Sequence, residues 1–383
     1  MRATIFLLSL AAFASAASIR VTDALLPRIA SDFGVGLDRA SAVVTGFAVA
    51  YGIMQVAFGP LGDRFGKLRV IGLSTGAAAI ASAACAMAPG LDGLLVARIF
   101  AGAFCGCIIP LSLAWIGDTV DYEHRQGVIA RFLLGQIAGL ASGSAIGGFA
   151  ADAAGWRWPF AAFAAWLAVC SVMITFVSRK DHAHRQAIEA HFTRDAASIL
   201  QRHWPRVVVA SVFLEGMLVF GALAFIPTHL HFERGVELSI AGLALVPYAL
   251  GGAIFAVFAG RIVRALGEVT LAKSGALLLF IGCLGVAWSP DPVVAGGGCL
   301  VAGLGFYALH NTLQTNATQM APERRGAAMA LFASLFYLGQ SFGVALAGVL
   351  IEHIGTMPVL IGAGVLVVPV GLAFARRRAA HAA

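Results

Sequence analysis

Apolar stretches of about twenty residues recur along the whole chain, separated by short charged or Gly/Pro-containing breaks. A helix needs roughly 20 mostly apolar residues to cross the hydrocarbon core of a bilayer. The composition agrees, with 60% hydrophobic and 12% charged residues and a mean hydropathy of +0.87, because a water-soluble surface needs far more charge. The sequence therefore predicts an all-α membrane protein without a large soluble domain.

Twelve such stretches predict twelve transmembrane helices, with boundaries set to within about four residues. We place these spans at 4–26, 40–61, 68–88, 92–116, 130–152, 157–178, 206–228, 239–260, 269–289, 293–317, 327–350 and 356–375. The first stretch has an alternative interpretation, because Arg2, its apolar residues and Ala14–Ala17 also resemble a secretory signal with a small-residue cleavage site. We expect a retained helix, since the apolar run is long for a signal core and the repeat described next requires it.

A shift of about 200 residues brings the two halves of the chain into register. The coinciding residues are Pro27 with Pro227, Gly52 with Gly252, Glu123 with Glu323, Arg125 with Arg325, Gly139 with Gly339, Gly143 with Gly343, Gly148 with Gly348, Asp152 with Glu352 and Gly155 with Gly355. Chance among abundant glycines explains the proline and charged pairs poorly. We therefore predict two six-helix halves, 1–178 and 206–383, related by a parallel repeat and joined by a linker at 179–205.

The linker is charged, rich in histidine and without clear apolar periodicity, so we expect a cytoplasmic segment with a short surface helix at about 185–201. His182, His184 and His191 could bind zinc, and this alternative stays open. Because these residues form no closed ligand set at a recognised spacing, the expectation we adopt is no metal site and no cofactor.

Lysine and arginine are concentrated on one side of the predicted topology. The N-terminus, every second connection and the C-terminal tail carry 20 of them, whereas the opposite connections carry Arg20, Arg28, Arg39, Arg157 and Arg234. Because cytoplasmic loops are enriched in these residues, we expect both termini in the cytoplasm of a bacterial inner membrane. The net charge of +7 then reflects topology and contact with anionic lipid, and no nucleic-acid partner is expected.

The connection between the second and third spans reads GPLGDRFGKLRV. Its glycines permit a tight turn, Asp63 can meet a neighbouring helix N-terminus, and its basic residues favour the cytoplasmic surface. The segment resembles the Gly-x-x-x-Asp-Arg-x-Gly-Arg-Lys signature of the major facilitator superfamily, with matches at Gly59, Asp63, Arg64, Gly66 and Lys67. The resemblance covers essentially the whole chain and implies that family's fold, with this loop as a latch between the halves. The second copy, GRIVRALGE at 260–268, lacks the Asp and implies an asymmetric latch.

Two further segments resemble motifs of this family. In the fourth span Arg98 and Gly102 match a motif whose arginine is associated with proton coupling, although Ala101 replaces the usual Gln. In the fifth span GLASGSAIGG resembles the glycine motif of antiporters that export drugs and metabolites; Gly139, Gly143, Gly147 and Gly148 match, and Ser144 replaces the proline. Close helix packing explains these glycines equally well. The segment at 310–326 is also similar to stretches of bacterial drug-efflux and sugar-efflux members, which implies export.

Ionisable residues at membrane depth are costly and suggest function. Asp23 and Arg98 lie at comparable depth below the outer ends of the first and fourth spans and can pair; the alternative is a local Arg20–Asp23 pair, with Arg98 held by carbonyl groups. Glu215 and His310 both lie about 12 Å from the cytoplasmic ends of their spans. They predict either a proton relay or a structural hydrogen bond.

Neutral polar residues near these charges are substrate-binding candidates: Gln136, Asn311, Gln314 and Gln340. The predicted function is proton-coupled efflux of a small amphiphilic compound by alternating access, by a monomer whose partners are that compound, protons and the bilayer. The alternatives are proton symport or facilitated uptake of a metabolite and, more remotely, an intramembrane enzyme. The sequence contains no nucleophile elbow, metal cluster or nucleotide-binding loop that would favour the enzyme.

Overall fold

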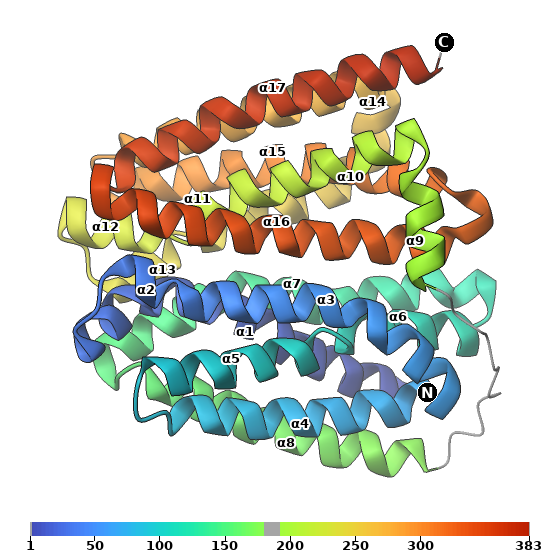
Figure 1. The fold of residues 1–383 in the computed structure, drawn as a ribbon, viewed down its shortest axis with the longest axis horizontal. Helices are drawn as coiled ribbons and strands as arrows, with labels where there is room; N and C mark the ends of the chain where they lie inside the picture. Colours follow the sequence, from blue (N-terminus) through green and yellow to red (C-terminus); the bar gives the residue numbers. More distant parts are fainter. Residues whose placement is uncertain (1, 180–191, 383) are drawn as a thin grey trace.

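The computed structural model describes residues 2–179 and 192–382, which form helices joined by short turns (Figure 1). The chain runs through α1 (Arg2–Phe33), α2 (Leu37–Ala40), α3 (Ala42–Phe65), α4 (Lys67–Ala86), α5 (Leu91–Cys105), α6 (Ile108–Thr119), α7 (Tyr122–Ala153), α8 (Arg157–Ser178), α9 (Phe192–Leu200), α10 (His203–Glu215), the π-helix η1 (Gly216–Phe220), α11 (Gly221–Leu223), α12 (Ile226–Arg234), α13 (Leu238–Leu243), α14 (Val246–Ala287), α15 (Pro292–Gln319), the 3-10 turn η2 (Pro322–Arg324), α16 (Arg325–Ile354) and α17 (Thr356–Ala382).

Eleven helical stretches of the described chain are long and apolar enough to cross a membrane. One of them, Leu238–Ala287, has 50 residues, about 75 Å of helix at 1.5 Å per residue, which is more than twice the bilayer core. Its path breaks at Gly267, whose φ of 70° and ψ of 163° are not helical. This stretch therefore supplies the eighth and ninth spans, and the all-α fold with twelve spans is confirmed.

Several helices extend beyond the predicted spans. α1 continues to Phe33 and ends at Gly34, whose φ of 63° stops the helix, and α7 begins at Tyr122. Polar residues at these ends lowered the local hydropathy without interrupting the backbone hydrogen bonds. Within the predicted surface helix of the linker, residues 192–200 are helical as α9, whereas 185–191 lie outside the described residues.

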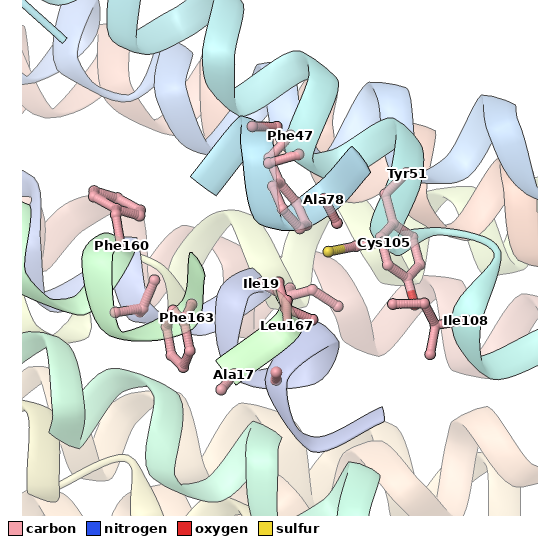
Figure 2. Packing of buried hydrophobic residues seen from close by; sticks show 14 of the residues in the cluster. Ala17, Ile19, Phe47, Tyr51, Ala78, Cys105, Ile108, Phe160, Phe163 and Leu167 are labelled. Atoms are coloured by element: carbon pink, nitrogen blue, oxygen red, sulfur yellow. The ribbon is translucent and has the colours of Figure 1, made fainter. Parts of the chain in front are cut away.

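The apolar core divides into two large clusters. One is built mainly from α1 to α8 and the other mainly from α10 to α17; we call these groups the N-terminal and C-terminal bundles, seen as the blue-to-green and green-to-red parts of Figure 1. Figure 2 shows the middle of the first cluster, with Phe47 and Tyr51 of α3, Cys105 of α5, Leu167 of α8 and Ile19 of α1 among its members. The division at residues 178 and 206 stays a prediction.

Glycines form a close seam inside each bundle. A β-carbon on Gly139 or Gly143 of α7 would overlap the carbonyl oxygens of Phe13 or Ala17 of α1. In the C-terminal bundle, Gly339 and Gly343 of α16 lie in the same way against Phe213 of α10 and Met217 of η1. Because small residues let backbones touch, α1–α7 and α10/η1–α16 are two closely packed helix pairs with the same glycine spacing.

The two bundles meet at the end that carries the turns after α1, α7, α12 and α16, which we call the outer end in line with the predicted orientation. Asp152, at the end of α7, accepts the backbone N–H of Ser239 in the first turn of α13, with Oδ2 and N 2.7 Å apart. Glu352, at the end of α16, accepts the N–H of Leu37 in the first turn of α2, with Oε1 and N 2.5 Å apart. Each bundle thus supplies an acidic cap to a helix of the other, which satisfies one of the free N–H groups at that helix start.

Candidate functional site

Arg20 and Asp23 form a buried ion pair on α1. The Arg20 Nη1 donates to Asp23 Oδ2 at 3.0 Å, and both side chains are buried. The local pair is therefore the arrangement present, and Asp23 forms no ion pair with Arg98. Because α1 continues to Phe33, Arg20 lies in the middle of a helix and was wrongly assigned to the outer connections. Arg28, Arg39, Arg157 and Arg234 remain there, so the charge asymmetry still predicts cytoplasmic termini.

Arg98 of α5 is 1% exposed and is held by backbone carbonyls. Its Nη1 donates to Ser18 O at 3.1 Å and its Nε to Val43 O at 3.3 Å. The guanidinium also lies 4.0 Å from the ring centre of Phe47, a favourable contact between a cation and an aromatic face. Its Nη2 has no hydrogen-bond partner. This buried cation is solvated by dipoles and a ring rather than neutralised by a carboxylate.

Glu215 and His310 are brought together as expected from their equal depth. His310 Nδ1 lies 2.8 Å from Glu215 Oε2, and Glu215 is fully buried while His310 keeps some exposure. The second carboxylate oxygen, Oε1, has no hydrogen-bond partner. Directly after Glu215, the helix widens into the π turn η1, a feature that is frequent at functional sites.

Aromatic side chains surround this carboxylate–imidazole pair. The His310 ring lies 4.9 Å from the ring centres of both Phe306 and Phe336, and Phe220 lies 5.2 Å from each of these phenylalanines. Arg20 of the other bundle lies 4.6 Å from the ring centre of Phe220. The charged groups of the two bundles are therefore linked through two successive aromatic rings, Phe220 and then Phe306 or Phe336. Sequence reasoning missed the contact between Arg20 and Phe220, because the two residues lie far apart in the chain. The sequence indicated only that Arg20 lies one turn before Asp23.

The neutral candidates differ in exposure. Gln340 of α16 is buried, with its backbone N close to Gly216, the first residue of η1. Asn311 of α15 and Gln136 of α7 are partly buried, and Gln314 is exposed. The backbone of Gln340 thus lies close to the residue after Glu215, and Asn311 directly follows His310 in the chain. Their part in substrate binding, like that of Gln136 and Gln314, stays a prediction.

The loop between α3 and α4 forms a small ionic cluster. Lys67 Nζ lies 2.9 Å from Asp63 Oδ1 and 2.5 Å from Asp118 Oδ2 of α6, and Gly66 has a φ of 93° that favours glycine. Arg64 lies 5.1 Å from the ring centre of Phe65, and a β-carbon on Gly59 would meet open space. These ionic contacts join helices of the same bundle, and the role of the loop as a latch between bundles stays a prediction.

The corresponding loop of the C-terminal bundle uses different residues. Glu268, directly after Gly267, accepts hydrogen bonds from Asn316 Nδ2 of α15 at 3.0 Å and Arg378 Nε of α17 at 2.9 Å. A carboxylate is thus present in this loop too. It follows its glycine in the sequence, whereas Asp63 precedes Gly66, and it forms an ion pair with Arg378 of the last helix.

The four glycines of the fifth span are packing residues in this structure. Gly139, Gly143 and Gly147 lie against carbonyl groups of α1, whereas Gly148 lies against Leu238 O of α13 in the other bundle. Packing accounts for all four, and an additional antiport role stays a prediction. In residues 2–179 and 192–382 no three His, Cys, Asp or Glu side chains gather in a way that suits a metal ion. His182, His184 and His191 lie outside the described residues.

The model of the Major Facilitator Superfamily matches residues 8–344. The chain belongs to the Major Facilitator Superfamily. Multidrug export protein EmrB of Haemophilus influenzae is 31% identical over 153 residues, which are 40% of this chain and 30% of that protein; EmrB of Escherichia coli K12 is 31% identical over the same shares. This chain thus spans about 30% of the length of these relatives. An uncharacterized MFS-type transporter of Bacillus subtilis, YwfA, is 26% identical over 89% of this chain and 84% of its own length.

Solved structures show the same fold. The crystal structure of nucleoside transporter NupG has a TM-score of 0.78 at 13% identity and covers 97% of both chains. A bacterial homolog to human lysosomal transporter Spinster, in an inward-facing and occupied conformation, has a TM-score of 0.76 at 15% identity, covering 97% of this chain and 95% of that chain. The chain is therefore a multi-pass membrane protein with the fold of this superfamily.

Proposed function

We propose that this carrier exports a small amphiphilic compound from a bacterial cytoplasm in exchange for protons, by alternating access in the inner membrane. The names of the EmrB relatives, multidrug export proteins, support export. The observation that carries the proposal is the fully buried Glu215, with one oxygen on His310 and the other without a partner. A carboxylate in such a place is costly to keep charged, so it is suited to take up and release a proton during transport.

The aromatic rings around this pair supply the substrate surface. Phe306 and Phe336 pack against His310 and Phe220 packs against both, so this region combines apolar rings with a polar pair and suits a compound with an apolar body and a polar group. If the compound and a proton cannot be bound at Glu215 at the same time, the carrier exchanges one for the other. If the compound binds only when Glu215 is protonated, the carrier is a symporter, so the experiment also tests the direction of transport.

The contacts between bundles support alternating access. The acidic caps Asp152 and Glu352 and the hydrogen bond from Ser334 Oγ to Gly52 O join the bundles from the outer end to the middle. At the inner end, the Lys67 and Arg378 ion pairs join residues of one bundle only. We infer an inward-open state, from which release of the outer contacts would open the opposite side.

The test uses purified protein in liposomes, with ethidium as an aromatic amphiphilic probe. With an acidic lumen, an antiporter accumulates ethidium inside as protons leave; accumulation only with an alkaline lumen indicates symport, and equilibration without accumulation indicates facilitated diffusion. Glu215→Gln is expected to reduce gradient-driven accumulation by at least about tenfold, the equivalent of 1.4 kcal/mol in coupling, while exchange of labelled for unlabelled ethidium continues. Asp23→Asn is measured in the same way.

Asp92→Asn is the matched control, because Asp92 is an exposed acid in the first turn of α5. It should leave both assays unchanged. Full gradient-driven accumulation by Glu215→Gln and Asp23→Asn would contradict proton coupling through these residues. Accumulation in the parent protein only with an alkaline lumen would contradict export.

A further inference from the structure

A cavity of about 520 Å³ opens on the side of the N-terminal bundle between α1, α7 and α8. Its apolar wall includes Phe6, Leu10 and Phe13 of α1, Leu134 of α7 and Trp166 of α8. Phe6, Leu134 and Trp166 also belong to the exposed apolar surface, which in a membrane faces lipid. The volume lies within the range of about 300–1,000 Å³ that is typical of small-ligand sites.

The polar groups in this wall are already paired. Ser9 Oγ donates to Ile5 O at 2.9 Å, and Trp166 Nε1 donates to Leu10 O at 3.1 Å. The Trp166 ring also lies 5.5 Å from the ring centre of Phe13, which holds α8 against α1. The cavity therefore offers an apolar surface with few free hydrogen-bonding groups and suits a hydrocarbon chain.

Two arginines stand at the inner end of this cavity. Arg2 at the start of α1 and Arg131 in the first turns of α7 both line it and are exposed. Neither forms an ion pair or side-chain hydrogen bond within the described chain, in contrast to the paired Arg28 of α1. An apolar cavity with two free cations at its mouth is complementary to a molecule with a hydrocarbon chain and an anionic head.

We propose that this cavity binds one anionic phospholipid of the inner leaflet. One acyl chain lies against Phe6, Leu10 and Trp166, and the phosphate lies at the level of Arg2 and Arg131. In the orientation predicted from the charge distribution, these arginines are at the cytoplasmic headgroup level, where anionic lipid is attracted to basic side chains. The site is independent of the proposed transport reaction, because it lies on the lipid-facing side of α1.

Tryptophan quenching by brominated lipid tests the site. The protein is placed in bilayers in which acyl-brominated phosphatidylglycerol or phosphatidylcholine replaces the unbrominated lipid, and the signal of Trp166 is the difference between the parent and Trp166→Phe. We expect Trp166 to show a preference of about 25-fold for phosphatidylglycerol, which is about fivefold for each of the two arginines near an anionic surface. Trp158, on the same helix and also exposed, is measured through Trp158→Phe and should show no such preference.

Arg2→Gln combined with Arg131→Gln should reduce the preference at Trp166 to that at Trp158. Arg131→Gln alone is measured as well, because Arg2 also contributes to membrane orientation. Arg261→Gln with Arg264→Gln is the matched control, since these two exposed arginines lie on α14, away from the cavity. Equal preference at both tryptophans of the parent would indicate ordinary surrounding lipid and overturn the proposal. So would a preference at Trp166 that survives the loss of Arg2 and Arg131.

Discussion

The seam between α1 and α7 and the seam between α10/η1 and α16 use the same construction at positions about 200 residues apart. The contacts are Gly139 on Phe13, Gly143 on Ala17, Gly339 on Phe213 and Gly343 on Met217. The charged groups beside the seams differ, because one bundle has Arg20, Asp23 and Arg98 and the other has the Glu215–His310 pair among aromatic rings. The packing geometry is thus the same in both bundles, whereas the buried charged groups beside it differ: two arginines and one aspartate in one bundle, and a glutamate with a histidine in the other.

Glycine-to-alanine changes test whether the two seams are equivalent. Gly139→Ala and Gly343→Ala each push a methyl group into a carbonyl oxygen and should each lower the free energy of unfolding by about 1–3 kcal/mol. Because the sites are far apart, the double variant should show the sum. Thermal unfolding in detergent measures the effect. Gly362→Ala is the control, since a β-carbon there meets nothing within 4 Å; a large loss in only one seam would break the comparison.

The Arg98→Met change tests whether the buried Arg98 serves stability or transport. Removal of a buried cation without a carboxylate partner should leave the free energy of unfolding unchanged or raise it by up to about 4 kcal/mol. Ethidium transport should fall, because an ionisable residue at membrane depth is costly and is usually retained for function. Arg28→Met, at an exposed arginine of α1, should change neither. A marked drop in the unfolding temperature of Arg98→Met would instead make Arg98 a structural residue.

The two acidic caps at the outer end should contribute equally to the outer-closed state. Asp152→Ala and Glu352→Ala each remove a helix cap supplied by the other bundle, which costs about 0.5–2 kcal/mol and favours outer opening by a factor of about 2–30. A cysteine at the buried Ser41, at the outer contact between α2 and α16, reports opening through its rate of maleimide labelling. Asp92→Ala should leave that rate unchanged, and an unequal response of the two caps would show that one side dominates closure.

The inner loops should show the smallest effects. Lys67→Gln breaks the partly exposed Asp63–Lys67–Asp118 cluster, and Arg378→Gln breaks the Glu268 pair; each should cost about 0.2–1 kcal/mol. Thermal unfolding at low and high salt measures both, since screening reduces such contributions. Arg69→Gln, at an exposed residue of α4, serves as control. A cost well above this range for Lys67→Gln would indicate that the loop also holds a contact that forms in another state.

The sequence was sufficient for features that depend on distance along a helix. Hydropathy predicted twelve spans because bilayer thickness sets helix length, and a rise of 1.5 Å per residue predicted that Glu215 and His310 lie at the same depth. Depth alone did not determine which residues face each other. Asp23 and Arg98 share a depth, yet Asp23 meets Arg20 and Arg98 meets the carbonyls of Ser18 and Val43.

Contacts between the bundles could not be predicted either, because the sequence gives the depth of a residue but not the direction in which its side chain points. The contact of Arg20 with Phe220 depends on the rotation of α1 and η1 about their axes and on how the bundles dock. The register pairing of Asp152 with Glu352 was visible in the sequence, but their reciprocal capping of α13 and α2 required the packed structure. Depth along a helix was predictable, whereas side-chain partners were not, either within a bundle or between the two bundles.

The π turn at Gly216–Phe220 also determines where the seventh span can lose a residue. A π turn holds one residue more than an α turn, so a deletion there would convert it to regular helix and leave both flanking segments facing their present neighbours. A deletion elsewhere in the same helix would rotate everything beyond it by about 100° and turn Thr228 and His229 away from their buried positions. Length variation among close homologues of this chain should therefore concentrate directly after Glu215.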